Sequence, residues 1–280
     1  MMNLKPLPRR VWGAMRRRKI TVAIAAWGLL VAILAFTAPS VTVAEQSPLA
    51  RALPVVNEAS TLAVSALSND GEAFTVGALV FDGDCSITLV RSGHRYTRSI
   101  TAHVDSAEVA PTAHRLAKTL KKKYPLVKGG TDKRPRYSAI VDEYVALELS
   151  TDDNTVTWKS ETGCRPDSDT TAVLQPPFNH PAEAATAMDL LGVISPSWTI
   201  GEVSCLGDGG TVARTAWATG RLPDDADADI AAVVERLPGD AIVRVAKEKH
   251  VSYLWQGRSL TVSLTGRVVT ASATQACPSA

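Results

Sequence analysis

The sequence predicts an α+β fold. We expect two tandem repeats of an antiparallel sheet with helices packed on one face, each with an internal disulfide, behind one N-terminal transmembrane helix. Three observations predict it: an uncharged N-terminal segment, four cysteines that all follow it, and a residue pattern that occurs twice. The expected order is a basic cytoplasmic tail (1–19), a transmembrane signal anchor (20–38), a linker (39–56), repeat unit 1 (57–166), a linker (167–181) and repeat unit 2 (182–280).

The N-terminal segment from Ile20 to Ala38 has nineteen residues and no charge. As a helix it would span about 28 Å, close to the hydrocarbon thickness of a bilayer. The basic residues before it are Lys5, Arg9, Arg10, Arg16, Arg17, Arg18 and Lys19. Because basic residues that flank a membrane helix stay on the cytoplasmic side, we expect a cytoplasmic N-terminus and an extracytoplasmic C-terminal domain in a single-pass membrane protein. Cleavage near Ala44, followed by secretion, is the less favoured alternative.

The net charge of +2 averages two unlike parts of the chain. Seven of the 30 basic residues, and none of the 28 acidic ones, lie in the first 38 positions, so the remainder has a net charge of −5. A domain with this balance does not attract nucleic acid through its overall field. We therefore expect no nucleic-acid partner.

The four cysteines, Cys85, Cys164, Cys205 and Cys277, are separated by 79, 41 and 72 positions. Zinc sites usually bring their cysteines in close pairs, so these gaps favour disulfides over a four-thiolate metal site. Of the three possible connectivities, only Cys85–Cys164 with Cys205–Cys277 lets each repeat close itself. Each bridge would tie an early strand to the last one.

The repeat itself is visible in two places. Phe74-Thr75-Val76-Gly77 is matched by Trp198-Thr199-Ile200-Gly201, and a cysteine follows each. The stretches Pro125–Cys164 and Pro238–Cys277 are equally long and align without gaps. This alignment pairs Leu147 with Leu260, Ser150 with Ser263, Val156 with Val269 and Thr157 with Thr270.

Hydrophobic periodicity predicts the same elements in both halves. The first half has helices over 57–67 and 105–124 and strands over 75–81, 86–90, 95–104, 145–149 and 155–158. The second half has helices over 182–191 and 223–237 and strands over 199–204, 212–218, 260–264 and 268–271. The stretch 166–181, which is rich in proline, separates them.

The strongest charge feature is a run of cations with one acid, Asp132. Its candidate anion-binding members are Lys118, Lys121, Lys122, Lys123, Lys128, Lys133, Arg134 and Arg136. A solvated helix end followed by a flexible loop explains such a run. The functional alternative is a patch that docks on an anionic surface, such as lipid headgroups or an acidic envelope polymer.

No pattern in the sequence points to a catalytic or metal centre. The five histidines lack a tight ligand spacing, and no G-x-S-x-G elbow occurs. The acidic run 224–229 lacks the glycine and glutamate of a calcium loop. We expect no metal ion and no cofactor.

The order of anchor and disulfide-containing repeats resembles that of many exported bacterial proteins, a resemblance of architecture that transfers no residue. We expect a non-catalytic binding module of the cell envelope, held by the membrane, with an envelope protein, an anionic polymer or a small ligand between the repeats as partner. The alternative is an envelope hydrolase with a site between the two units that uses His94, His103 or His180.

Overall fold

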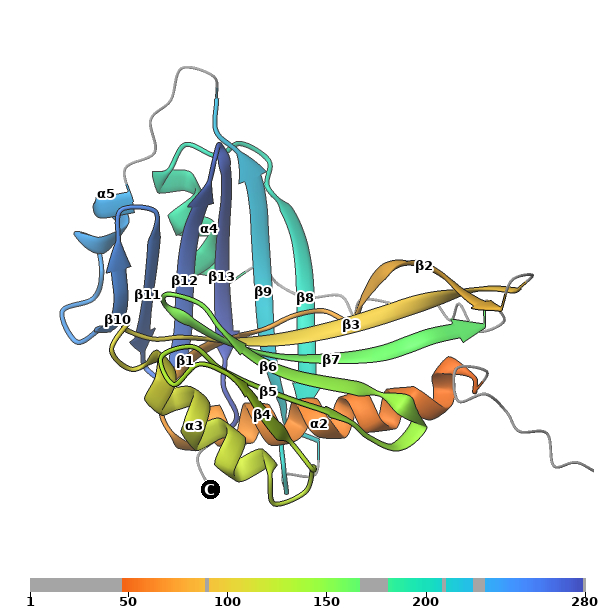
Figure 1. The fold of residues 1–280 in the computed structure, drawn as a ribbon. Helices are drawn as coiled ribbons and strands as arrows, with labels where there is room; N and C mark the ends of the chain where they lie inside the picture. The colour runs from red at the N-terminus through yellow and green to blue at the C-terminus, as the bar shows by residue number, and fades with distance from the viewer. Residues whose placement is uncertain (1–46, 89–90, 167–180, 208–209, 224–229, 279–280) are drawn as a thin grey trace, which may run out of the picture. The chain divides into compact units, whose positions relative to one another are not determined.

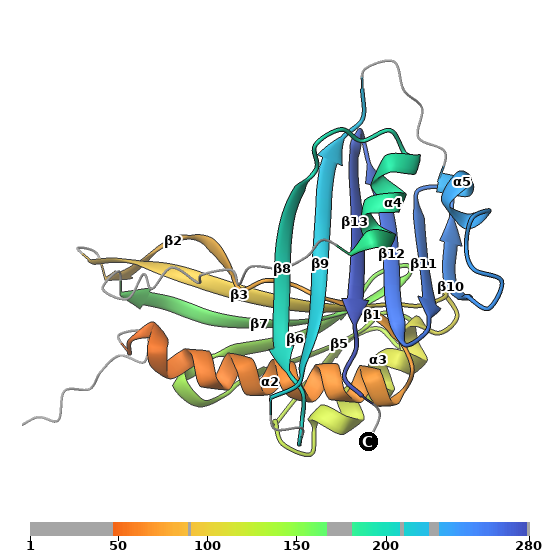
Figure 2. The same cartoon turned by 180° about the vertical axis from the view of Figure 1, so that it is seen from behind.

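A computed structural model describes residues 47–88, 91–166, 181–207, 210–223 and 230–278. These residues form two antiparallel sheets with five helical segments (Figures 1 and 2). The predicted membrane segment and the predicted linker and acidic run at 167–180 and 224–229 lie outside the described residues. Within the described part of the chain, no helix combines the length and apolarity that a membrane crossing needs.

The first sheet has seven strands in the order β1-β3-β7-β6-β5-β4, and β2 pairs with β3 beside β1. Its strands are β1 (Ala73–Val76), β2 (Val80–Thr88), β3 (Arg91–His103), β4 (Val127–Gly130), β5 (Pro135–Ile140), β6 (Ala146–Thr151) and β7 (Thr155–Pro166). Its helices are α2 (Leu49–Asn69), α3 (Val109–Leu120) and the 3₁₀ turn η2 (Asp142–Tyr144).

The second sheet has six strands in the order β10-β11-β12-β13-β9-β8. Its strands are β8 (Ser197–Ser204), β9 (Val212–Arg221), β10 (Ile242–Lys247), β11 (His250–Trp255), β12 (Arg258–Thr265) and β13 (Val268–Gln275). Its helices are α4 (Ala182–Leu190) and the short α5 (Ile230–Val234).

The two sheets fit a duplicated α+β domain. Reading β1 and β2 as one interrupted edge strand, both sheets have the same strand order and the same succession of helices and strands. The ungapped alignment of the two repeats also matches the strand register of their last hairpins. Leu147 lies opposite Ser160 in the β6–β7 hairpin, and its counterpart Leu260 lies opposite Ala273 in the β12–β13 hairpin.

Both disulfides have the predicted partners, Cys85–Cys164 and Cys205–Cys277, with Cα–Cα distances of 5.8 and 5.7 Å. The first bridge crosses over β3 at Gly93, which lies opposite Cys85 in the ladder. A Cβ at Gly93 would overlap the carbonyl oxygen of Arg165 and lie 3.0 Å from Cys164 Sγ. Glycine is therefore required where the bridge passes.

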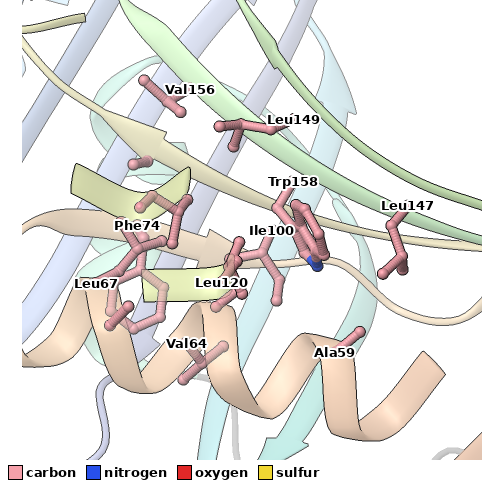
Figure 3. Close-up of a cluster of buried hydrophobic side chains, with 14 of the residues drawn as sticks. Ala59, Val64, Leu67, Phe74, Ile100, Leu120, Leu147, Leu149, Val156 and Trp158 are labelled. Carbon is pink, nitrogen blue, oxygen red and sulfur yellow. The ribbon is translucent and has the colours of Figure 1, made fainter. Parts of the chain in front are cut away.

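Helix α2 supplies one wall of the first core. Its buried face is largely alanine and valine, which lets it pack closely against β7 and β3 and also against β8 of the second sheet. Above it, the fully buried indole of Trp158 lies between Ile100 and Leu147 (Figure 3). The core of the first repeat also includes Val203, Cys205 and Ala213 of the second.

The two repeats contact each other through β1, which lies across the second sheet. The sheet face that it contacts carries hydroxyl side chains that are all 0–4% exposed: Thr215, Ser252, Ser259, Thr261, Ser272 and Thr274. The Phe74 N–H donates to Ser259 Oγ (3.2 Å) and the Val76 N–H to Thr215 Oγ1 (2.7 Å). Trp217 Nε1 donates to the Val76 carbonyl (3.2 Å). The second repeat thus provides hydrogen-bond partners for backbone groups on the outer edge of β1, which pairs with no strand there.

Three expectations about the elements need correction. The stretch after α3, interpreted as a loop, contains β4 and β5, and their counterparts β10 and β11 went unpredicted. Helix α2 begins at Leu49 rather than Asn57, because its N-terminal half is also buried. Helices cover one face of the second sheet, but β1 covers part of its other face.

Candidate functional site

A cleft of about 1110 Å³ lies at the end of the second sheet that carries the Cys205–Cys277 bridge. Five segments line it: the residues after α2, the start of β9, the start of β10, the β11–β12 turn and the chain after β13. Both repeats therefore contribute to the cleft. Its volume slightly exceeds the range of typical ligand pockets, about 300–1,000 Å³.

Two tight turns shape its walls. After α2, Gly71 adopts a φ of 64° and the Glu72 N–H donates to the Leu67 carbonyl, which ends the helix in a left-handed cap. Between β11 and β12, Gln256 and Gly257 have φ values of 49° and 72°. Positive φ at both central residues is typical of a type I′ hairpin turn, which holds the flanking strand ends in register.

A row of polar side chains crosses five neighbouring strands at this end of the sheet. The strand register places them directly opposite one another in the order Glu202, Arg214, Gln275, Arg258 and Trp255. Directly opposed residues in antiparallel strands project from the same face. The last four of them line the cleft.

The arginines of the cleft are held by partners at or outside its rim. Arg214 forms an ion pair through Nε with Glu202. Arg258 Nη1 lies 2.7 Å from Glu183 Oε1, at the start of α4. Arg244 Nη2 donates to the Gly71 carbonyl at 2.6 Å.

Both acids of the cleft have partners as well. Glu72 is buried and accepts hydrogen bonds from Arg115 Nη2 (2.7 Å) and Thr112 Oγ1 (3.4 Å). Asp240 Oδ1 accepts from Trp255 Nε1 at 2.8 Å, which fixes the indole plane. Guanidinium groups carry five donors each, so the cleft has more donors left for a ligand than acceptors.

The predicted basic residues are dispersed over the end of α3 and over β4 and β5. Four of them form ion pairs: Lys123 with Glu58, Lys128 with Asp132, Arg134 with Asp153 and Arg136 with Glu148. Lys121 Nζ lies 5.0 Å from the centre of the Tyr137 ring. Lys118, Lys122 and Lys133 are exposed and form no ion pair with another described residue. Anion binding by this region stays a prediction.

The candidate histidines are far apart along the first sheet. His94 Nδ1 lies 3.0 Å from Asp84 Oδ1 on the β2–β3 pair. His103, at the other end of β3, is buried at the junction of the repeats, where its ring lies 5.1 Å from that of His250 and Nε2 lies 3.3 Å from Thr75 Oγ1. His180 lies outside the described residues. The structure does not bring His94 and His103 together.

Burial, reinforced by the charge of His250, lowers the pKa of His103 to about 3, and burial also lowers the pKa of His250. At pH values between the folded pKa and the unfolded pKa of about 6.5, His103 is protonated in the unfolded chain but neutral in the folded protein. We expect this one residue to make the free energy of unfolding about 2 kcal/mol lower at pH 5 than above pH 7. Urea denaturation of the wild type and of His103→Gln at both pH values measures it. Equal losses in the two proteins would contradict the assignment, and His250→Gln gives a second test.

Comparisons with known proteins show distant similarity to solved structures and no match of other kinds. No family model matches the chain, and no curated protein matches it. A solved structure of a DUF4853 family protein from Actinomyces odontolyticus ATCC 17982 is similar at 16% identity and a TM-score of 0.33. The similarity covers 58% of this chain and 88% of that chain. At this level it gives neither a family nor a function. The disulfides themselves indicate an extracellular domain.

Sequence reasoning did not find the cleft, because its residues come from five separated segments. One signal was available. Large apolar residues alternate at Val251, Tyr253 and Trp255, and with β11 in place the strand register would have put Trp255 beside Arg258.

Proposed function

We propose that this protein is a membrane-anchored, extracytoplasmic binding module of the cell envelope, and that it holds its ligand in the cleft without catalysing a reaction. The observation that carries the proposal is the donor-rich cleft built by both repeats at the Cys205–Cys277 bridge. Among the described residues its lining contains no histidine, and its cysteine is oxidised. The uncharged segment Ile20–Ala38 with its basic flank supports the anchor.

The binding role is tested with the full-length protein in detergent micelles, mixed with isolated cell-envelope fragments and sedimented. We expect the wild type to sediment with the fragments. Gln275→Trp, which places an indole in the cleft, should remain in the supernatant. Thr265→Trp, exposed at the far end of β12, is the matched control and should behave as the wild type.

Two results would count against the proposal. Equal sedimentation of the wild type and Gln275→Trp would remove the cleft from the binding role. Time-dependent release of soluble fragments from the envelope, lost in Gln275→Trp but not in Thr265→Trp, would favour the hydrolase alternative. For the anchor, the chain should stay with membranes after an alkaline wash and be digested by protease added outside the cell.

A further inference from the structure

We propose that the cleft binds an acidic oligosaccharide, whose acid groups are held by Arg214 and Arg258 while a sugar ring packs against Trp255. The inference rests on the proposed function, because it names the ligand class of the same site. It is carried by the row of side chains across the sheet, together with the partners that Arg214, Arg258 and Trp255 already have.

The donors left over in the cleft require a ligand rich in acceptors. Arg214 uses Nε for Glu202, and Arg258 uses Nη1 for Glu183, so each keeps terminal N–H groups for a ligand. Arg244 has no carboxylate partner among the described residues, and its Nε is buried without an acceptor. Guanidinium groups bind planar anionic groups through paired hydrogen bonds. The complementary ligand group is therefore a carboxylate or a phosphate.

The spacing of the arginines requires more than one acidic group or an extended ligand. Arg214 on β9 and Arg258 on β12 are separated by β13, so their backbones lie about 10 Å apart. Gln275 stands between them and offers both a donor and an acceptor to a hydroxyl group. A single small anion would fill little of a cleft of about 1110 Å³. A short chain with repeated acidic groups matches both the spacing and the volume.

The aromatic side chain identifies the rest of the ligand as a sugar. Trp255 is partly exposed, lines the cleft next to Arg258, and is held in one orientation by Asp240. A fixed indole face packs against the apolar C–H face of a sugar ring, while the ring hydroxyls reach polar neighbours such as Gln256. Trp255 also lines an adjoining groove of about 360 Å³ beside α4, into which a longer chain could continue.

Isothermal titration of the full-length protein in micelles tests the inference with three probes: trigalacturonate, its neutral methyl ester and inorganic phosphate. We expect binding of the trigalacturonate, and at least tenfold weaker binding of the ester and of phosphate. Arg214→Gln and Arg258→Gln should each weaken binding of the acidic trimer about tenfold, and Trp255→Leu should weaken binding of trimer and ester alike. Arg221→Gln, a loss of the same charge at the far end of β9, should leave binding unchanged.

The inference is overturned if the ester binds as tightly as the acid, if phosphate binds as tightly as the trimer, or if neither arginine variant weakens binding. It is also overturned if the trimer fails to bind while the wild type still sediments with envelope fragments, a result that leaves the proposed function intact. Arg214 and Arg258 lie on different strands and pair with different acids, so a folding defect in one variant leaves the other as a test.

Discussion

Replacing Gly201 by alanine is expected to lower the free energy of unfolding by about 3 kcal/mol. Gly201 lies in β8, where the second sheet meets β1 of the first repeat. An added Cβ would overlap the Val76 carbonyl oxygen and lie 2.6 Å from the Gly77 carbonyl carbon. Because both neighbours are backbone atoms, no side chain can rotate away, and the two repeats would have to separate locally. Chemical denaturation followed by tryptophan fluorescence measures the loss.

Gly239→Ala is the matched control for this substitution. Gly239 has no positive φ, and a Cβ added there meets nothing within 4 Å. We expect this variant to be as stable as the wild type or slightly more stable, because alanine restricts the unfolded chain. If Gly201→Ala also left stability unchanged, the close crossing of β1 and β8 would be refuted.

Removal of the second disulfide, by the double change Cys205→Ser and Cys277→Ser, is expected to cost about 4 kcal/mol. The bridge closes a separation of 72 residues, and the chain-entropy model assigns a loop of that length this magnitude. The damage should extend into the first repeat, because Cys205 packs in the same core as α2. Hydrogen exchange should therefore show faster exchange of the α2 amides as well as of β8 and β13.

Removal of the first disulfide, by Cys85→Ser and Cys164→Ser, is the comparison. Its separation of 79 residues gives a similar entropic cost, but the bridge joins β2 to β7 and spans β3 near its start. We expect faster exchange there and little change in the β8–β13 region. Damage of equal extent in both double variants would contradict the unequal placement of the two bridges.

The sequence predicts those parts of the fold that depend on local pattern or on counting. The cysteine spacing predicts disulfides and the repeat predicts their pairing, while the ungapped match of Leu147 with Leu260 predicts a shared hairpin register that the structure confirms. The strands β4 and β10 were not predicted because they lie at the edges of the two sheets. All of β4 and most of β10 are exposed, so neither shows the alternation of buried and exposed residues that identifies a half-buried strand.

The candidate site could not be predicted for a different reason. Trp255 and Arg214 are 41 positions apart, and only the strand order β11-β12-β13-β9 brings them into one row. The contact between β1 and β8 could not be predicted for the same reason. The sequence shows that Gly77 and Gly201 occupy equivalent places in the repeat, but not that they lie against each other. Contacts between copies of a repeat leave no periodic signal within either copy.

The hydroxyl-lined contact of β1 has a consequence for any shortened form of the chain. A half-length version, translated as a separate product, would expose the unpaired edge of β1, and this edge could pair with the backbone of another chain. In the present chain the second repeat covers this edge, so a product without that repeat would expose it.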